Sequence, residues 1–372
     1  PPGVIACHGR CARPNSDRWP LMQQPDSAPL ILPYEGVQPV LQGPLAHAES
    51  GSAVLGRVTL GAGAMLQAFA TLRGDGQAIH VGPALFMGSH ATVHIAHELH
   101  GTAIGARVSV GRHAVVHACT VEDDCVVQDG ACILDGARVG AGSVVAAGSV
   151  VFSRAVLPAG HWCEGSPAVA VRPIGLAELR ALHADLRDAN QAPEAMQPAV
   201  APMAVQAQRT AYVAPTARVG IPLQMADETS LWFGCVLRLA KPGVASPGLR
   251  LEAGANVQDN SVVCTGPAGL HIGAECTVGH NVRLHDGRIG SQVLIGMGST
   301  LAPGTVVQDR VLLAAGSSTE PGQVLESGWL WGGRTARALS KLDERKLDLM
   351  RRAALNYRSY ARGFGAAARA GG

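Results

Sequence analysis

Residues 104–151 read IGARVSVGRHAVVHACTVEDDCVVQDGACILDGARVGAGSVVAAGSVV, and their spacing decides the fold. Aliphatic side chains recur here in steps of six, with one step of five. The series is Ile104, Val110, Val116, Val121, Val127, Ile133, Val139, Val145 and Val151. A six-residue period is typical of a hexapeptide-repeat solenoid, in which each unit is a short strand and a turn. The stretch therefore predicts a column of stacked coils with these residues pointing inward.

The same series recurs later in the chain. Its members are Ile272, Val278, Leu284, Ile289, Ile295, Leu301, Val307 and Leu313. The first eight positions of both series coincide after a shift of 168, including the single five-residue step. Chance does not reproduce an irregularity together with a period. The chain is therefore interpreted as a tandem duplication of one solenoid.

The composition agrees with this fold. The 372 residues are 47% hydrophobic but only 4% aromatic, and they include 46 glycines. Stacked aliphatic rungs fill a narrow core without large side chains, whereas a β-sandwich predicts turns every 8–12 residues and more aromatics. The net charge of +2 is not concentrated in one stretch, which disfavours nucleic acid as a partner. Apolar runs end well before 18 residues, so no membrane span is expected.

The nine cysteines are odd in number and scattered, as in reduced cytosolic proteins. The first thirty residues show no apolar stretch of the kind found in secretory signals. We therefore expect a cytoplasmic protein. Cys7, His8 and Cys11 look like half of a metal site, but no second cysteine pair follows them.

Four segments are expected. Residues 1–42 are Pro- and Gln-rich and predict a loose arm, and residues 190–209 are Ala-, Pro- and Gln-rich and predict a linker. The first solenoid with a trailing helix then occupies 43–189, and the second occupies 210–372. Helical spacing predicts a short helix over 176–186 and a longer amphipathic helix over 340–364, the latter capped by Ser340.

Histidines follow matching inward positions. With three strands to a coil, Val93 and Val116 lie one coil apart, so His94 and His117 stand on adjacent rungs. The same arithmetic places Cys264 and His285 on adjacent rungs of the second solenoid. Catalytic zinc takes three protein ligands and an open position. A third ligand would therefore have to come from a neighbouring subunit.

Several motifs resemble the γ-class carbonic anhydrases. Residues 278–285 read VGHNVRLH, similar to the VGH-x-x-x-LH signature of that family, and residues 256–259 resemble its N-I-Q-D run. Residues 73–75 resemble its R-G-D turn. The resemblance covers about two thirds of the chain. It implies left-handed parallel β-helices, homotrimers, and zinc at each subunit interface, with the first and third histidines from one subunit and the second from its neighbour.

Neither half matches the family's ligand set completely. In the first half His94, His117, Arg73 and Asp75 match, but Arg112 stands where the second histidine belongs, and Gly88 and Ser89 replace Gln and Asp. In the second half His280, His285, Arg238, Asn256, Gln258 and Asp259 match, but Cys264 replaces the first histidine and Ala240 the turn aspartate.

Three arrangements stay open. In the first, Cys264 and His285 of one chain bind zinc with His280 of the next. In the second, His94 and His117 meet His280 across a mixed interface, although two kinds of domain cannot alternate evenly around a threefold ring. In the third, both sites are decayed and the protein is a scaffold. The metal is expected to be zinc, with iron or no metal as alternatives.

The resemblance implies reversible hydration of carbon dioxide to bicarbonate. Gln258 would orient water at the metal, and Arg238 would pair with Asp259 across the subunit interface. Arg73 and Asp75 are expected to stabilise the interface. The rival activity is acyl transfer from coenzyme A, with His97 or His100 as general base.

Overall fold

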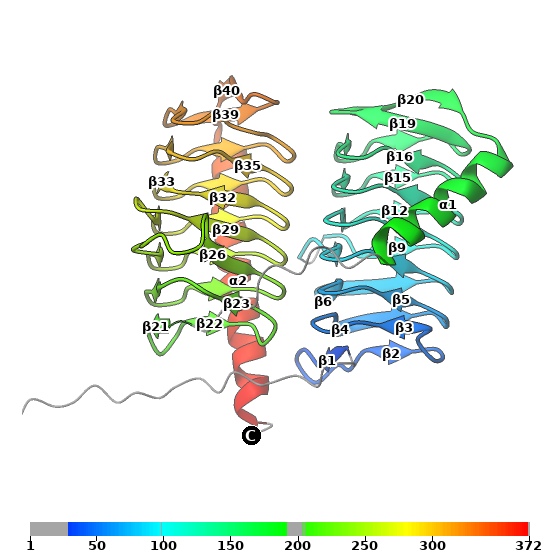
Figure 1. The fold of residues 1–372 in the computed structure, drawn as a ribbon, viewed down its shortest axis with the longest axis horizontal. Helices are drawn as coiled ribbons and strands as arrows, with labels where there is room; N and C mark the ends of the chain where they lie inside the picture. Colours follow the sequence, from blue (N-terminus) through cyan, green and yellow to red (C-terminus); the bar gives the residue numbers. More distant parts are fainter. Residues whose placement is uncertain (1–28, 98, 192–202, 204, 371–372) are drawn as a thin grey trace, which may run out of the picture.

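The computed structural model describes residues 29–370 except 98, 192–202 and 204. Two columns of stacked coils stand side by side in it (Figure 1). Each is a left-handed parallel β-helix followed by a helix, which confirms the predicted fold class. Cys7, His8 and Cys11 lie outside the described residues.

The first column has three faces, two of which are joined because β4 and β6 run around a corner. The joined sheet contains β1 (Leu30–Leu32), β2 (Val40–Leu41), β4 (Ala53–Leu60), β6 (Thr71–Val81), β8 (Thr92–His94), β9 (Thr102–Ile104), β11 (Val115–His117), β12 (Thr120–Val121), β14 (Cys132–Ile133), β15 (Arg138–Val139), β17 (Val150–Val151) and β18 (Val156–Leu157). The third face contains β3 (His47–Ala48), β5 (Met65–Leu66), β7 (Phe86–Met87), β10 (Ser109–Val110), β13 (Val126–Val127), β16 (Val144–Val145), β19 (His161–Gly165) and β20 (Ala168–Pro173).

The second column has three separate faces. One contains β21 (Val205–Ala207), β24 (Leu223–Met225), β27 (Leu249–Leu251), β30 (Leu270–Ile272), β33 (Gly287–Ile289), β36 (Thr305–Val307) and β38 (Val324–Leu325). The next contains β22 (Tyr212–Val213), β25 (Ser230–Leu231), β28 (Asn256–Val257), β31 (Thr277–Val278), β34 (Leu294–Ile295), β37 (Leu312–Leu313), β39 (Trp329–Gly332) and β40 (Arg337–Lys341). The last contains β23 (Arg218–Val219), β26 (Val236–Leu239), β29 (Val262–Thr265), β32 (Arg283–His285) and β35 (Thr300–Leu301).

The inward side chains form one narrow core in each column. The aliphatic residues of both six-residue series are buried, as their period predicts. Neighbouring strands pair in parallel, one coil apart, so that Val116 lies beside Val93 and Ile133. Each column ends in an antiparallel hairpin, β19–β20 and β39–β40. The first strand of each hairpin still pairs in parallel with the preceding coil, and the second strand, β20 or β40, runs back and leaves the repeat.

Aromatic side chains gather between the columns instead of inside them. All four tyrosines of the chain belong to one buried cluster. The cluster contains Leu30, Tyr34, Ala53, Leu55, Tyr212, Ala214, Trp232, Phe233, Tyr357, Tyr360, Ala361 and Phe364. We call it the aromatic seam. Because its members come from both columns and from the C-terminal helix α2 (Glu344–Ala370), it fastens the three together.

The helices and the segment boundaries differ from the expectations in detail. Helix α1 spans Leu176–Gln191, longer than predicted. Ser340 does not cap a helix, because it pairs with Leu330 in the β39–β40 hairpin and α2 begins at Glu344. The loose arm predicted over 1–42 is wrong for its last part, because β1 pairs with β4 through Leu30–Leu32 and so belongs to the first column. The linker expected over 190–209 lies mostly outside the described residues, and β21 already begins the second column at Val205.

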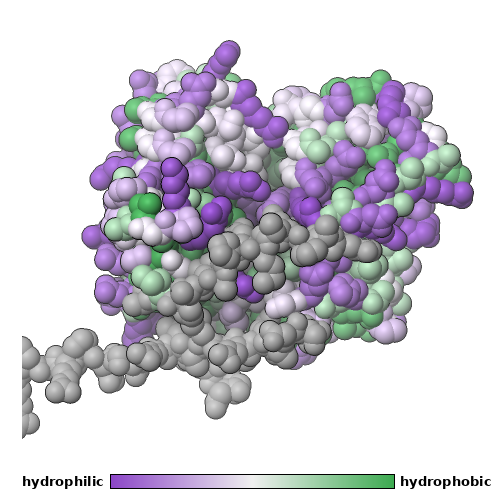
Figure 2. Space-filling model, viewed as in Figure 1, coloured by the Kyte–Doolittle hydropathy of each residue, from purple (hydrophilic) through white to green (hydrophobic). Residues whose placement is uncertain are grey.

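Polar residues predominate on the face of the molecule seen in Figure 2. Figure 2 shows hydrophilic residues over both columns and hydrophobic ones in scattered patches. This is the pattern expected when the inward side of each strand is apolar and the outward side faces solvent. No helix in the described part of the chain is long and apolar enough to cross a membrane.

The inward rungs carry the stability of each column. Ile133 is fully buried on β14, so Ile133→Ala leaves a cavity and should lower the free energy of unfolding by about 2–5 kcal/mol. Val156 on β18 is 71% exposed, and Val156→Ala should change it by less than about 0.5 kcal/mol. Chemical denaturation of both variants checks this. Equal effects at the two positions would contradict the assigned inward register.

Candidate metal centre

The pairing of the coils brings three histidines together at the junction of the columns. His94 and His117 end β8 and β11 of the first column and are direct neighbours in the parallel register. His280 follows β31 of the second column by two residues, at a turn. The two strand ends and the turn meet where the columns face each other, so one chain supplies all three imidazoles.

The three ring nitrogens converge. His94 Nδ1 lies 3.2 Å from His117 Nε2 and 3.1 Å from His280 Nε2. One nitrogen from each residue lies within 4.8 Å of the other two. A tetrahedral zinc ion with bonds of about 2.05 Å separates its ligand nitrogens by roughly 3.3 Å. The spacing therefore fits three ligands of one small cation.

Each outward-turned nitrogen of the triad faces a carboxylate. His94 Nε2 lies 3.0 Å from Asp75 Oδ1, and His117 Nδ1 lies 2.6 Å from Asp135 Oδ1.

The third contact, from His280 Nδ1 to Asp259 Oδ2, is 3.0 Å long but is not aligned as a hydrogen bond. Metal-binding histidines usually present their second nitrogen to a carboxylate in this way, which fixes the tautomer and the ring orientation.

These carboxylates determine where the protons sit. A neutral imidazole has one N–H, and the carboxylate contacts favour placing it on the outward nitrogen of each ring. The inward nitrogen of His94 then presents its lone pair to those of His117 and His280 at hydrogen-bond distance. Lone pairs that face each other in a buried site repel unless a cation or a proton lies between them. The geometry therefore favours a cation at the centre of the triad.

Burial keeps the imidazoles of His94 and His280 neutral. Burial, with the charge of Arg73 next in size, holds the pKa of His94 well below its usual value of 6.5. Burial also lowers the pKa of His280 to about 4, although Asp259 opposes the shift. Neutral imidazole is the form that binds metal. The site therefore supplies His94 and His280 in the protonation state that binds metal at neutral pH.

Arg73 links the two columns next to the triad. Its Nε and Nη2 donate to Asp259 Oδ2 of the second column at 3.0 and 2.8 Å, and its Nη1 donates to Asp75. The guanidinium also lies 4.3 Å from the ring centroid of Trp232. Arg73, Asp75 and Asp259 are buried. Burial alone would raise the pKa of Asp259, but Arg73 and His280 outweigh it and hold that pKa below the usual value.

The structure assigns this pairing differently from the sequence. We expected Arg238 to pair with Asp259 across a subunit interface, but the partner of Asp259 is Arg73 of the same chain. Arg238 instead lies on β26 beside Cys264, and its buried Nε has no hydrogen-bond partner within the described residues. The reason is that the second column presents the Asp259 turn to the first column.

Cys264 and His285 do lie on adjacent rungs, as predicted. They are on the face made of β23, β26, β29, β32 and β35, and neither belongs to the triad. Burial raises the pKa of the Cys264 thiol, although Arg238 and Arg283 oppose the shift. Within the described part of the chain, only the His94, His117 and His280 group offers three ligands in reach of one ion.

The other predicted residues surround these groups. Gln258 and Asn256 are buried, and Gln258 Nε2 donates to Asn256 Oδ1 at 3.4 Å. Arg112, at the place of the family's second histidine, donates to the carbonyl of Ala189 at the end of α1. The turn of the first column that carries Arg112 is thus hydrogen-bonded to α1 and supplies no ligand to the triad.

Sequence reasoning missed Asp135, Tyr357 and Tyr360. Asp135 stands 18 residues after His117, one coil later, so the repeat alone could have placed it beside the triad. Tyr357 Oη lies 3.2 Å from His280 Nε2 and accepts a hydrogen bond from Arg73 Nη2 at 2.9 Å. No period predicts this contact, because Tyr357 lies on α2.

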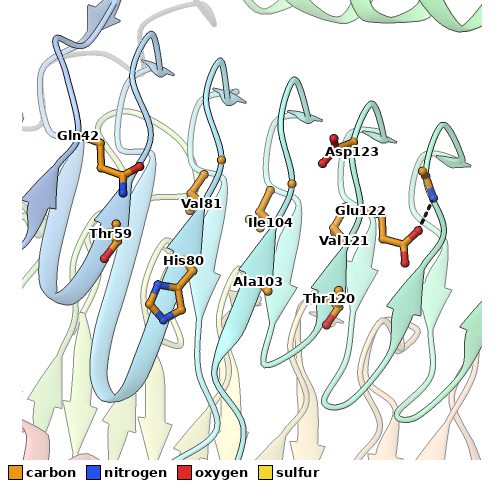
Figure 3. A pocket seen from close by; sticks show the side chains of 13 residues that line it. Gln42, Thr59, His80, Val81, Ala103, Ile104, Thr120, Val121, Glu122 and Asp123 are labelled. Atoms are coloured by element: carbon orange, nitrogen blue, oxygen red, sulfur yellow. Dashed lines mark hydrogen bonds between the residues drawn. The ribbon is translucent and has the colours of Figure 1, made fainter.

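A groove of about 610 Å³ lies elsewhere, on the outer face of the first column. Figure 3 shows it crossing the coils past Thr59, His80, Ala103 and Thr120, with Glu122 and Asp123 at one end. None of the triad lines it, nor do His97 and His100. Two carboxylates at its edge disfavour the phosphates of coenzyme A.

Comparisons with known proteins show what the chain is similar to. No family model matches the chain. A segment of it is 36% identical to a protein named carbonic anhydrase from Geobacillus kaustophilus, over 38% of this chain and 78% of that protein. The chain belongs to the γ-class carbonic anhydrase-like family of hexapeptide-repeat proteins.

Other relatives are longer than the matched segment. A mitochondrial γ carbonic anhydrase 1 from Arabidopsis thaliana is 34% identical over 41% of this chain and 56% of its own length. The chain thus spans about half the length of the first curated relatives that it matches. A solved putative acetyltransferase from Desulfovibrio desulfuricans, with 14% identity and a TM-score of 0.51 over 89% of this chain and 81% of its own, shares the fold.

The Arg73–Asp259 pair should dominate the stability of the junction. Asp259→Asn keeps the shape but leaves the buried guanidinium with one carboxylate, and we expect a loss of about 3 kcal/mol or more in unfolding free energy. Glu178→Gln removes a half-exposed partner of Arg172 and should have no measurable effect. Denaturant titration of both variants measures this, and an unchanged midpoint for Asp259→Asn would show that the pair does not hold the columns together.

The lowered pKa of His280 predicts a pH dependence. Between about 6.5 and about 4 the unfolded chain binds a proton on this imidazole and the folded one does not, so stability should fall as pH drops through that window. The test is the denaturant midpoint of protein kept in chelator over a pH series. His280→Gln should flatten the slope. A midpoint constant from pH 6.5 to 4 in the parent protein would contradict the prediction.

Proposed function

We propose that the chain is a metal-dependent carbonic anhydrase with one site, built by His94 and His117 of the first column and His280 of the second. The convergence of three imidazole nitrogens, on rings whose other nitrogens each lie beside a carboxylate, carries the proposal. It is the mixed arrangement of the three considered from sequence. The threefold symmetry that counted against it does not apply to a contact made within one chain.

Zinc fits the donor set best. Three imidazoles suit zinc or iron, and a site with three protein ligands and one open position is the arrangement of catalytic zinc. When bound there, zinc would supply Lewis acidity, which makes hydroxide available near neutral pH for attack on carbon dioxide. The substrate pair of carbon dioxide and bicarbonate is part of the proposal.

The chain's own residues prepare the site. Asp75 and Asp135 hold the rings of His94 and His117 in the orientation that aims a nitrogen inward, and Asp259 lies 3.0 Å from His280 Nδ1. Arg73 fixes two of these carboxylates. Tyr357 closes the side next to His280 with its hydroxyl. Helix α2 and the aromatic seam exclude bulk water, which strengthens each of these electrostatic contacts.

Assembly and compartment remain predictions. We propose that the contact between the two columns corresponds to one subunit contact of the trimer implied by the resemblance. The described cysteines are free and buried, which fits the cytoplasmic location proposed from their scattered positions. The Arabidopsis relatives are named as mitochondrial, so a mitochondrial compartment is the alternative to test.

Metal content separates the three arrangements. The purified protein should hold one zinc per chain by elemental analysis. His94→Ala and His280→Ala should each remove it, because loss of a ligand costs more than the roughly 10- to 100-fold in affinity that an outer partner costs. Stopped-flow hydration of carbon dioxide should fall with the metal.

Cys264→Ala is the matched control, since Cys264 holds the equivalent rung on the second column. It should keep both the metal and the activity. Loss of zinc in Cys264→Ala with retention in His94→Ala would instead place the site on the second column. A protein without metal after supplementation would support the scaffold.

A further inference from the structure

Two turns of the second column reach the first column with asparagine side chains. Asn260 directly follows Asp259, and Asn281 directly follows the ligand His280. Both asparagines are buried, and both have left-handed backbone, with φ of 58° and 55°. The turns lie one coil apart, since the N–H of Asn281 donates to the carbonyl of Asp259 at 3.0 Å. Each turn thus places an amide at the junction, next to a residue of the metal centre.

Both amides meet the hydroxyl of Thr92 on the first column. Asn281 Nδ2 donates to the carbonyl of His90 at 2.7 Å, so this amide turns its oxygen toward Thr92. Thr92 Oγ1 donates to that oxygen at 2.7 Å. The hydroxyl has only one proton, so Asn260 must donate to it, and Asn260 Nδ2 lies 2.9 Å away. One fully buried hydroxyl therefore fixes the orientation of both amides.

Stacked rings fix His90, the second residue of the first column that contacts both asparagines. The ring of His90 lies between those of Phe69 and His113, with centroids 4.8 and 5.1 Å away and interplanar angles of 16° and 12°. Its Nδ1 lies 3.2 Å from Asn260 Oδ1, and its carbonyl accepts the hydrogen bond from Asn281. The surface that receives the two asparagines is thus itself held by packing.

The network lies beside the metal ligands on both sides of the junction. Thr92 stands two residues before His94 on β8, so both side chains leave the strand on the same face. Asn281 stands one residue after His280. The hydrogen bond between Thr92 and Asn281 therefore ties the strand that carries one ligand to the turn that carries another.

His280 is the ligand that most needs such a tie. His94 and His117 are neighbours in one sheet, and the strand pairing fixes their spacing. His280 comes from the other column, and its contact with Asp259 is not aligned as a hydrogen bond. Ligands must be held to within about 0.5 Å of the productive geometry. The place of His280 therefore depends on how its turn is held against the first column.

We propose that Thr92 and Asn281 are positioning residues for the third ligand of the metal centre. Their hydrogen bond holds the His280 turn at the distance at which its imidazole shares one cation with His94 and His117. Neither residue belongs to the triad, and both act through His280. The inference rests on the metal site of the proposed function and adds to it the contact that joins its two halves.

Zinc affinity, measured by competition with a chelator, tests this role. Thr92→Val keeps the size but removes the hydroxyl, and Asn281→Gly removes the amide at a left-handed position that glycine adopts easily. Each should weaken zinc binding about 10- to 100-fold, the range for outer partners of metal ligands. Thr92→Ser keeps the hydroxyl and should bind zinc within about twofold of the parent protein.

Gln292→Gly is the matched control for the backbone. Gln292 is exposed and also left-handed, with φ of 56°, so this variant should keep the zinc affinity of the parent. The double variant Thr92→Val/Asn281→Gly should lose clearly less affinity than the product of the two single losses, because both changes remove the same hydrogen bond. A loss equal to that product would show that the two residues act separately and would overturn the proposal.

Denaturant titration in chelator separates positioning from a merely structural role. If Thr92→Val and Asn281→Gly destabilise the metal-free protein but bind zinc as the parent does, the proposal is wrong. An equal loss of affinity in Thr92→Ser or Gln292→Gly would also overturn it. A parent protein that binds zinc without hydrating carbon dioxide would overturn the proposed function and leave this inference standing. A parent that binds no zinc would overturn both.

Discussion

The buried ion pair between Arg73 and Asp259 is the contact on which the junction depends. It joins the two columns, and its members also contact Asp75, Tyr357 and His280, which set the metal-facing groups. A buried guanidinium without carboxylates is costly. The columns must therefore meet in the one register that supplies Asp259, and that register also delivers His280 to His94 and His117.

The aromatic seam explains how a chain poor in aromatics holds this register. Small aliphatic residues fill both columns, so large rings are available for the contact between them. Trp232 stacks against Arg73, and Tyr357 and Tyr360 extend from α2 to the histidines. Packing and chemistry thus share the same side chains at the junction.

Periodicity predicted what the repeat controls. The step of six fixed the coils, the inward rungs and the adjacency of His94 with His117 and of Cys264 with His285. The period could not show that the turns with Asp259 and His280 face the first column, because that depends on α2 and on contacts between the columns. The partner of Asp259 was therefore assigned to Arg238 instead of Arg73, and the contribution of Tyr357 was invisible.

Because both columns belong to one polypeptide, dilution cannot separate the three histidines of the metal centre. Two separate chains that share ligands come apart at low concentration, whereas here the donors of both halves stay at a high effective concentration. The first column therefore needs only His94 and His117, and the second column needs only His280. Arg112 and Cys264 stand at the positions where the remaining ligands of two complete sets would be, and neither belongs to the triad.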